Sequence, residues 1–158
     1  MTSRLVALLL AVVPSLASAA ALCSFTSTPA LGFGAYDDSS PASTDSSTSL
    51  TVQCFRIGGP ADVDVTLQIG PSATSGGNAP RQMAGPAGNR MNYNLYRDSG
   101  RTQVWGQTPG VDTATITVAG IPNAGSRSGT FVIYGRIPAL QNVPAGSYSD
   151  SVQLTVSP

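Results

Sequence analysis

The side chains that could move protons or bind ions in this chain of 158 residues are of very few kinds. It has eight basic and eight acidic residues and no histidine; every base is arginine and every acid is aspartate. Asp62 and Asp64 alternate in an apolar segment, so they share a strand face where paired carboxylates could act as general acid and base. The surrounding sequence favours a solvent-exposed strand face for Asp62 and Asp64 over a catalytic pair. Asp37 and Asp38 lie in a serine-rich stretch, where a weak Ca²⁺ site has no further ligand pattern to support it.

Patterns that would mark a catalytic nucleophile are also missing from the sequence. The segment GSRSG (125–129) has Arg127 where a G-x-S-x-G motif would have its serine. Arg97, Asp98 and Arg101 are predicted to form a turn with surface ion pairs. We therefore predict that the protein is not an enzyme and has no cofactor and no metal site.

Cys23 and Cys54 are the two cysteines. In an exported protein an even pair indicates one disulfide. The loop it would close holds about 32 residues, for which chain-entropy arithmetic gives roughly 3–4 kcal/mol of stabilisation. Two free thiols are the alternative, and a metal site is disfavoured because there is no histidine and no second cysteine pair. We predict a Cys23–Cys54 disulfide.

The first residues of the sequence indicate export. Arg4 precedes the apolar run 5–13, which is too short to cross a bilayer, and small residues follow. We predict a signal peptide over residues 1–19, with cleavage after Ala21 as the alternative, and one domain over residues 20–158. After cleavage the exported protein would have seven arginines and eight aspartates, a net charge of −1. Its surface would therefore have no strong positive potential to attract nucleic acid. No later segment is apolar enough to span a membrane.

The elements expected to position these residues are strands. Apolar residues recur at alternate positions in several short segments, and nowhere at helical spacing over ten residues or more. These segments are 30–36, 49–54, 62–70, 90–98, 114–121, 129–137 and 146–158. Met91, Tyr93 and Leu95 are expected to face inward, and Asn92 and Asn94 outward. About seven short strands separated by turn signals are typical of an all-β sandwich.

Three polar or Gly/Pro-rich stretches are predicted to be loops. They are residues 37–48, 70–89 and 137–146, and a short strand around Gln82 and Met83 is the alternative within the second. Arg81–Asn89 is expected to be a surface loop that tolerates substitution.

Four groups of residues resemble the motifs of a known family. They are F-G-x-Y at 33–36, Y-N-L-Y-x-D at 93–98, W-G at 105–106 and P-A-G-x-Y-x-D at 144–150. In this order and spacing, over nearly the whole exported part, the chain resembles the spore coat protein U domain. That domain occurs in archaic chaperone–usher pilus subunits and in a spore surface protein.

The resemblance implies both a fold and a set of partners. The fold is an immunoglobulin-like β-sandwich that lacks its last strand and therefore exposes a groove. The implied partners are a periplasmic pilus chaperone that lends a strand first, an outer-membrane usher, and other pilin subunits whose N-terminal segments later replace the chaperone's strand. Such pairing is β-augmentation by donor-strand complementation.

The C-terminal segment is predicted to border this groove. Tyr148, Val152, Leu154 and Val156 alternate with polar residues, which indicates a half-buried strand. The resemblance implies that these four residues form the donor-strand and chaperone interface.

The chain departs from the family pattern in two places. It ends in Ser157-Pro158 and not in an aromatic residue. Only three residues lie between Ala19 and Cys23, whereas a donor strand needs roughly ten. We therefore expect a strand acceptor, and not a donor.

The favoured function is a structural subunit of a chaperone–usher fibre, exported to the periplasm and then placed on the cell surface. A stand-alone spore-coat or envelope protein that closes its own sandwich is the alternative. A small carbohydrate-binding module is a third, with Trp105, Tyr96 and Tyr134 as its exposed aromatic residues. A lone tryptophan in a sandwich is more typical of the core or rim.

Overall fold

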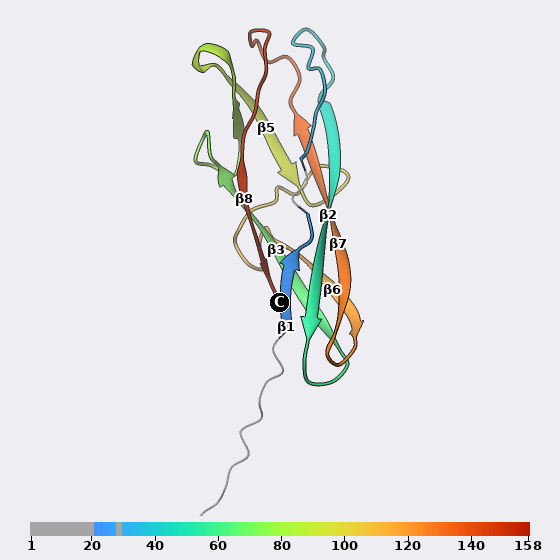
Figure 1. The fold of residues 1–158 in the computed structure, drawn as a ribbon. Helices are drawn as coiled ribbons and strands as arrows, with labels where there is room; N and C mark the ends of the chain where they lie inside the picture. Colours follow the sequence, from blue (N-terminus) through green and yellow to red (C-terminus); the bar gives the residue numbers. More distant parts are fainter. Residues whose placement is uncertain (1–20, 28–29) are drawn as a thin grey trace, which may run out of the picture.

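The computed structural model describes residues 21–27 and 30–158, so the predicted signal peptide lies outside the described residues. The described chain forms eight strands and a single 3₁₀ turn, η1 (Pro86–Gly88) (Figure 1). The strands are β1 (Ala21–Phe25), β2 (Thr44–Arg56), β3 (Ala61–Ser72), β4 (Arg81–Ala84), β5 (Arg90–Tyr96), β6 (Ala114–Ile121), β7 (Gly125–Ile137) and β8 (Val152–Ser157). No helix in this part of the chain has the length and hydropathy to cross a membrane.

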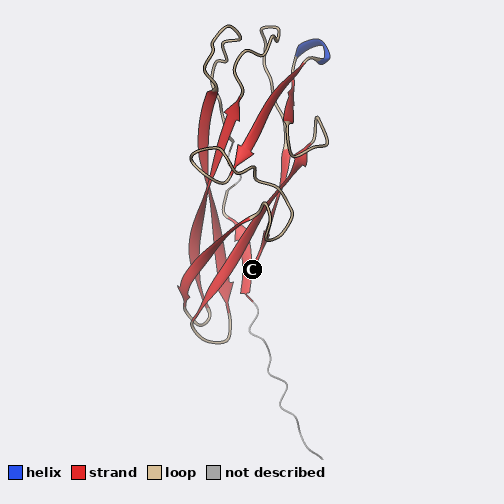
Figure 2. Ribbon diagram, turned by 180° about the vertical axis from the view of Figure 1, so that it is seen from behind, coloured by secondary structure: helices blue, strands red, loops and turns tan. Residues whose placement is uncertain are grey.

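The strands form two antiparallel sheets that pack against each other as a sandwich. The larger sheet has the order β1-β2-β7-β5-β4, and the smaller has the order β6-β3-β8. β2 and β7 pair along their whole length, from Thr44 opposite Ile137 to Arg56 opposite Gly125. Figure 2 shows that most strands run along the long axis of the domain, with loops at its ends and across its middle. The all-β sandwich predicted from the strand pattern is therefore confirmed.

The core lies between the two sheets and follows the alternation in the sequence. Successive side chains of a strand point to opposite faces, so every second residue is buried. In β5, Met91, Tyr93 and Leu95 are buried, whereas Asn92 and Asn94 are only partly covered. The other strands contribute Leu50, Val52, Cys54, Val63, Val65, Leu67, Ile69, Val118, Ile121, Phe131, Ile133 and Ile137. The inward face predicted for Met91, Tyr93 and Leu95 is therefore confirmed.

The predicted loop at 37–48 is wrong in its second half, because β2 already begins at Thr44. The residues there are polar, but their backbone pairs with the last residues of β7. Asp45 reinforces the pairing: its carboxylate accepts hydrogen bonds from Arg136 at 2.7 and 2.8 Å and forms an ion pair with Arg101 at 3.3 Å. Strand pairing thus overrides the local preference of serine and threonine for turns.

The predicted strand at residues 30–36 is not a strand. Leu31 and Phe33 do point inward, where they pack against the core. However, Gly34 has a φ of +74°, a left-handed conformation that interrupts a strand. Within the described part of the chain, no backbone–backbone hydrogen bond joins residues 30–36 to a neighbour.

The prediction that Arg81–Asn89 is a surface loop is wrong for its first four residues. Residues 81–84 form β4, which pairs with β5, so the alternative of a short strand around Gln82 and Met83 is the correct one. Arg81 is fully buried and Met83 nearly so. The sequence analysis missed this short strand because glycine and proline residues surround it. Those residues predict turns, but they do not predict that residues 81–84 pair with β5.

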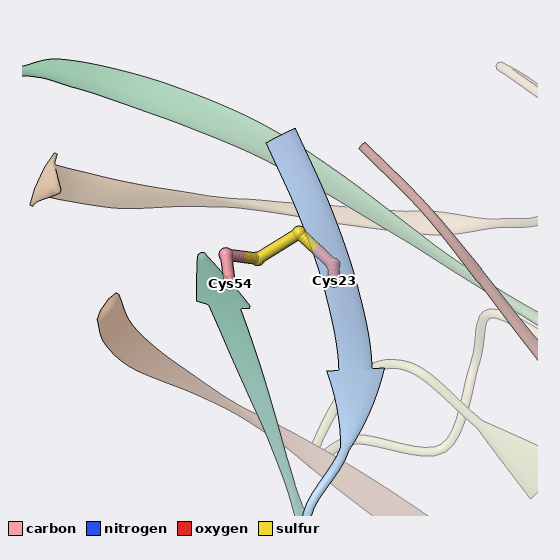
Figure 3. Close-up of a disulfide and its surroundings, with 2 residues drawn as sticks. All are labelled: Cys23 and Cys54. Carbon is pink, nitrogen blue, oxygen red and sulfur yellow. A yellow bond between two sulfur atoms is a disulfide. The ribbon is translucent and has the colours of Figure 1, made fainter. Parts of the chain in front are cut away.

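A disulfide joins Cys23 and Cys54, as the sequence predicted (Figure 3). The two residues are directly opposite each other in the β1–β2 ladder, with their Cα atoms 4.1 Å apart. The bond fastens β1, which has no partner on its other side in the sheet, to the long strand β2. It therefore anchors the edge of the larger sheet.

Leu95 tests the assignment of the core face. Leu95→Ala should lower the free energy of unfolding by roughly 2–5 kcal/mol, because it deletes buried methyl groups and leaves a cavity. Val132→Ala on the exposed face of β7 is the control and should change it by less than about 1 kcal/mol. Equal effects in chemical denaturation would contradict the assignment.

The disulfide has a direct mass-spectrometric test. The denatured protein treated with iodoacetamide without reductant should gain no mass, and after reduction it should gain two carbamidomethyl groups. Alkylation of both thiols without reductant would show that the exported protein does not form the bond.

Candidate functional site

Two sheet edges that have no strand partner among the described residues lie near each other on one side of the sandwich. β1 ends the larger sheet and β8 ends the smaller one, and the two strands approach each other. Residues 30–36 continue upward from β1, and β8 descends toward the C-terminus (Figure 1). Backbone N–H and C=O groups along such edges are available to another strand.

An apolar groove of about 1080 Å³ opens beside these edges, where Phe25 at the end of β1 and Val152 and Leu154 of β8 line it. One wall consists of residues 30–36, and the other runs from Val143 to Leu154. Core residues from both sheets form the floor, namely Ile69, Met83, Met91, Tyr93, Leu95, Ile133 and Ile137. Side chains of the core therefore form the floor of this groove.

Three of the four predicted interface residues line the groove. Val152 and Leu154 are half-buried, while Ser151, Gln153 and Thr155 on the other face of the segment are exposed. Val156 is also half-buried against the core but lies beyond the lining residues, opposite Leu67 of β3.

Tyr148 lines the groove at its other end and is held by its surroundings. A Cβ atom at Gly85 would lie 2.1 Å from the Tyr148 ring, so only glycine leaves room for the ring there. The Tyr148 hydroxyl donates a hydrogen bond to the Pro144 carbonyl at 2.8 Å. Tyr148 thus shapes the wall as well as facing the groove.

The wall at residues 30–36 was not predicted to belong to the site. Phe33 packs edge-on against Tyr93, with the ring centroids 6.1 Å apart. Its ring lies over Gly135 of β7, where a Cβ atom would come within 2.7 Å of it. The F-G-x-Y motif was the sequence signal for this wall, but a motif does not reveal which part of the fold it faces.

Arg81 is a buried cation that joins the strands beneath the groove. Its Nη2 donates to the carbonyls of Ile69, Gly70 and Trp105 at 3.2, 3.0 and 2.8 Å. Its Nη1 donates to the Asn94 side chain at 3.0 Å. Burial lowers the pKa of Arg81, and the nearby Tyr93 and Asp150 oppose this shift. The guanidinium thus satisfies three backbone carbonyls that belong to two different segments of the chain.

Asp150 ties the groove wall before β8 to both sheets. Tyr93 donates its hydroxyl to Asp150 Oδ2 at 2.7 Å, and the backbone N–H of Thr74 donates to Oδ1 at 3.1 Å. Burial alone would raise the pKa of Asp150, but these hydrogen bonds outweigh it and lower the pKa. Burial and the same bond raise the pKa of Tyr93 well above its ordinary value. Tyr93 therefore stays a neutral donor to an ionised carboxylate.

The remaining polar residues form no evident chemical centre. Asp62 and Asp64 accept hydrogen bonds from Gly120 and Thr117 on the exposed sheet face. Asp98 accepts hydrogen bonds from the Thr102 and Gln103 amides in its turn, while Arg101 pairs with Asp45. Among the described residues, no three His, Cys, Asp or Glu side chains are placed to hold a metal ion.

The aromatic set of the carbohydrate-binding alternative is not an exposed platform. Trp105 is 1% exposed, and its indole N–H donates to the Leu67 carbonyl at 3.0 Å. Tyr96 and Tyr134 are opposite each other in the β5–β7 ladder, and Arg101 stacks over the Tyr134 ring. Trp105 is therefore a core residue and cannot stack on a sugar.

This geometry defines a class of protein: an immunoglobulin-like β-sandwich with an open apolar groove between its sheets. The sequence profile of the Spore Coat Protein U domain matches residues 8–155, and the chain belongs to this family. It is 34% identical over 137 residues to Protein U of Myxococcus xanthus, a match that covers 80% of this chain and 70% of that protein. The family resemblance stated from the motifs is thereby confirmed.

A solved structure shows a similar fold. It is the CsuC–CsuE chaperone–tip adhesion subunit pre-assembly complex from archaic chaperone–usher Csu pili of Acinetobacter baumannii. The TM-score is 0.56 at 15% sequence identity, and the match covers 87% of this chain. It covers 40% of the compared chain, so this protein spans well under half of that chain's length.

Arg81 offers a test of the framework beneath the groove. Arg81→Met keeps most of the aliphatic volume but leaves three buried carbonyls without their donor. The free energy of unfolding should fall by about 3–5 kcal/mol. Arg127→Met, at an exposed position, should change it by less than about 0.5 kcal/mol. A loss below about 1 kcal/mol for Arg81→Met in chemical denaturation would show that the network contributes little.

Proposed function

We propose that the protein is an exported, non-enzymatic structural subunit of a surface fibre and that its groove accepts a β-strand from another chain. The observation that carries this proposal is the apolar groove beside two sheet edges that have no strand partner among the described residues. A strand lying there would hydrogen-bond to the outer edge of β8. Its alternate side chains would cover the floor of the groove, which is how β-augmentation combines affinity with register.

The proposal also explains how a chain with such an edge avoids aggregation. A long strand edge beside exposed apolar side chains is a template for uncontrolled pairing. Here the edge includes Val152 and Leu154, whose side chains are only half-buried. A donated strand would cover the apolar surface and pair the backbone at the same time.

The partners follow from this mechanism. A periplasmic chaperone would donate a strand first, and a segment of another subunit would replace it as an outer-membrane usher assembles the fibre. The solved structure with the similar fold is that of a chaperone–subunit pre-assembly complex, and we propose the same kind of partner here. Residues 1–19 would direct export to the periplasm, from which the protein would reach the cell surface.

A second candidate is a spore-coat or envelope protein that assembles without a donated strand. The match to the Spore Coat Protein U domain and the identity to Protein U favour it. In that function, contacts between copies or within the chain would protect the edge of β8. The two candidates differ in whether the groove of the isolated protein can take up a strand.

A synthetic peptide tests this difference. The probe has about ten residues, in which valine or leucine alternates with threonine, and lysine at both ends for solubility. Because a ligand that binds only the folded state stabilises it by mass action, the melting temperature should rise with peptide concentration. A peptide of the same composition without the alternation should have no effect. If the protein is a stable monomer whose melting temperature ignores both peptides, the second candidate is favoured.

Adjacent residues on the two faces of β8 localise the binding. Leu154→Asp should abolish the stabilisation by the peptide, because it places a carboxylate in the apolar wall. Thr155→Asp is the matched control, because it puts the same charge on the exposed face one residue away, and it should retain the stabilisation. Equal responses of the two variants, measured by thermal shift, would show that the peptide binds elsewhere.

A further inference from the structure

The methionines that follow the predicted signal peptide lie side by side in the floor of the groove. The sequence has three methionines, and Met1 begins the predicted signal peptide. Met83 of β4 and Met91 of β5 are directly opposite each other in the antiparallel ladder, and both line the groove. Every thioether that the exported protein would keep is therefore at one place.

Both methionine side chains are covered by protein on most sides but border the open groove. The exposed fraction is 8% for Met83 and 4% for Met91, and the floor around them is apolar, with Ile69 and Leu95 among its residues. A groove of about 1080 Å³ admits a molecule as small as hydrogen peroxide. The two thioethers are thus within reach of a small oxidant that enters the groove.

Hydrogen peroxide converts a thioether to a sulfoxide. A lone pair of the sulfur attacks one peroxide oxygen, the O–O bond breaks, a sulfur–oxygen bond forms and water leaves. The sulfur is oxidised by two electrons, and the peroxide is reduced by the same two. Methionine sulfoxide is polar and chiral, so covering it with apolar side chains is unfavourable unless its oxygen accepts a hydrogen bond.

We propose that Met83 and Met91 form an oxidation site that closes the groove: peroxide oxidises them while the groove is empty, and the oxidised groove no longer accepts an apolar strand. The oxidation follows from the position of the two side chains alone, whereas its effect on strand uptake rests on the proposed function. A strand already in the groove would cover both methionines and protect them. The site would therefore inactivate subunits that meet the oxidant before they meet a partner, and reduction of the sulfoxides would restore them.

Treatment of the folded, disulfide-bonded protein with hydrogen peroxide tests the oxidation site. After digestion, mass spectrometry should find one added oxygen on Met83 and one on Met91. Trp105, which is 1% exposed in the core, should remain unmodified and serves as the internal control. The alternating peptide should slow both reactions in proportion to the fraction of protein that it occupies. If the two methionines react only in the denatured protein, the groove does not expose them and the proposal is wrong.

Peptide binding after oxidation tests the closure of the groove. The oxidised protein should bind the alternating peptide about tenfold more weakly than the untreated protein. The double variant Met83→Leu/Met91→Leu keeps the apolar volume without a thioether, so it should bind the peptide equally well before and after peroxide treatment. Equal binding by treated and untreated wild type would overturn the closure and leave the proposed function intact. Failure of the untreated protein to bind would overturn the proposed function, and the closure with it.

A glutamine substitution imitates the polarity of the sulfoxide without peroxide. Met83→Gln should weaken peptide binding about as much as oxidation does. Ala84→Gln is the matched control, because it puts the same side chain on the exposed face of β4 one residue away, and it should leave binding unchanged. The near-UV circular dichroism of the oxidised protein should remain that of the folded protein. Loss of this spectrum on oxidation would show that the sulfoxides disrupt the core and do not act on the groove, which would contradict the proposal.

Discussion

The backbone N–H and C=O groups along the two outer sheet edges are the constraint on which the rest of the structure depends, because they have no strand partner among the described residues. A sandwich needs both sheets to cover a common core, and each sheet must end somewhere. Here β1 and β8 end their sheets on the same side, and apolar core residues border the groove beside them. In the function proposed above, a strand from another chain would cover this groove. The groove is thus a consequence of the strand order and not a local feature of one loop.

Buried polar residues keep this incomplete sandwich in one arrangement. Arg81 satisfies carbonyls of β3 and of the segment at Trp105, and Asp150 joins Tyr93 of β5 to the residues before β8. Buried polar groups are costly when unpaired, so a network in which most are paired favours a single geometry. The disulfide does the same for β1. Asp150 lines the groove and Arg81 is bonded to Ile69 in its floor, so these two residues help to fix the shape of the groove.

The family motifs acquire a physical meaning from this arrangement. F-G-x-Y supplies Phe33 on the core and Tyr36, whose hydroxyl donates to the Pro138 carbonyl, and W-G supplies the buried Trp105 whose carbonyl Arg81 holds. In P-A-G-x-Y-x-D, Tyr148 bonds back to Pro144 and Asp150 accepts from Tyr93. Residues of F-G-x-Y, Y-N-L-Y-x-D and P-A-G-x-Y-x-D thus line the groove.

The amino-acid sequence by itself determined most of the strands, the inward face of β5 and the disulfide, because alternation along a strand and an even cysteine pair in an exported chain are local signals. It also indicated the half-buried wall of β8. It did not reveal that residues 30–36 lack a strand partner, that Arg81 is buried in a short strand, or that hydrogen bonds of Ser46 and Tyr36 hold the wall at residues 30–36. Those features depend on which segments become neighbours, and the partners lie far apart in the sequence, as Tyr36 and Gln141 do. Only the tertiary structure decides such pairings, since each residue's local preference is compatible with several of them.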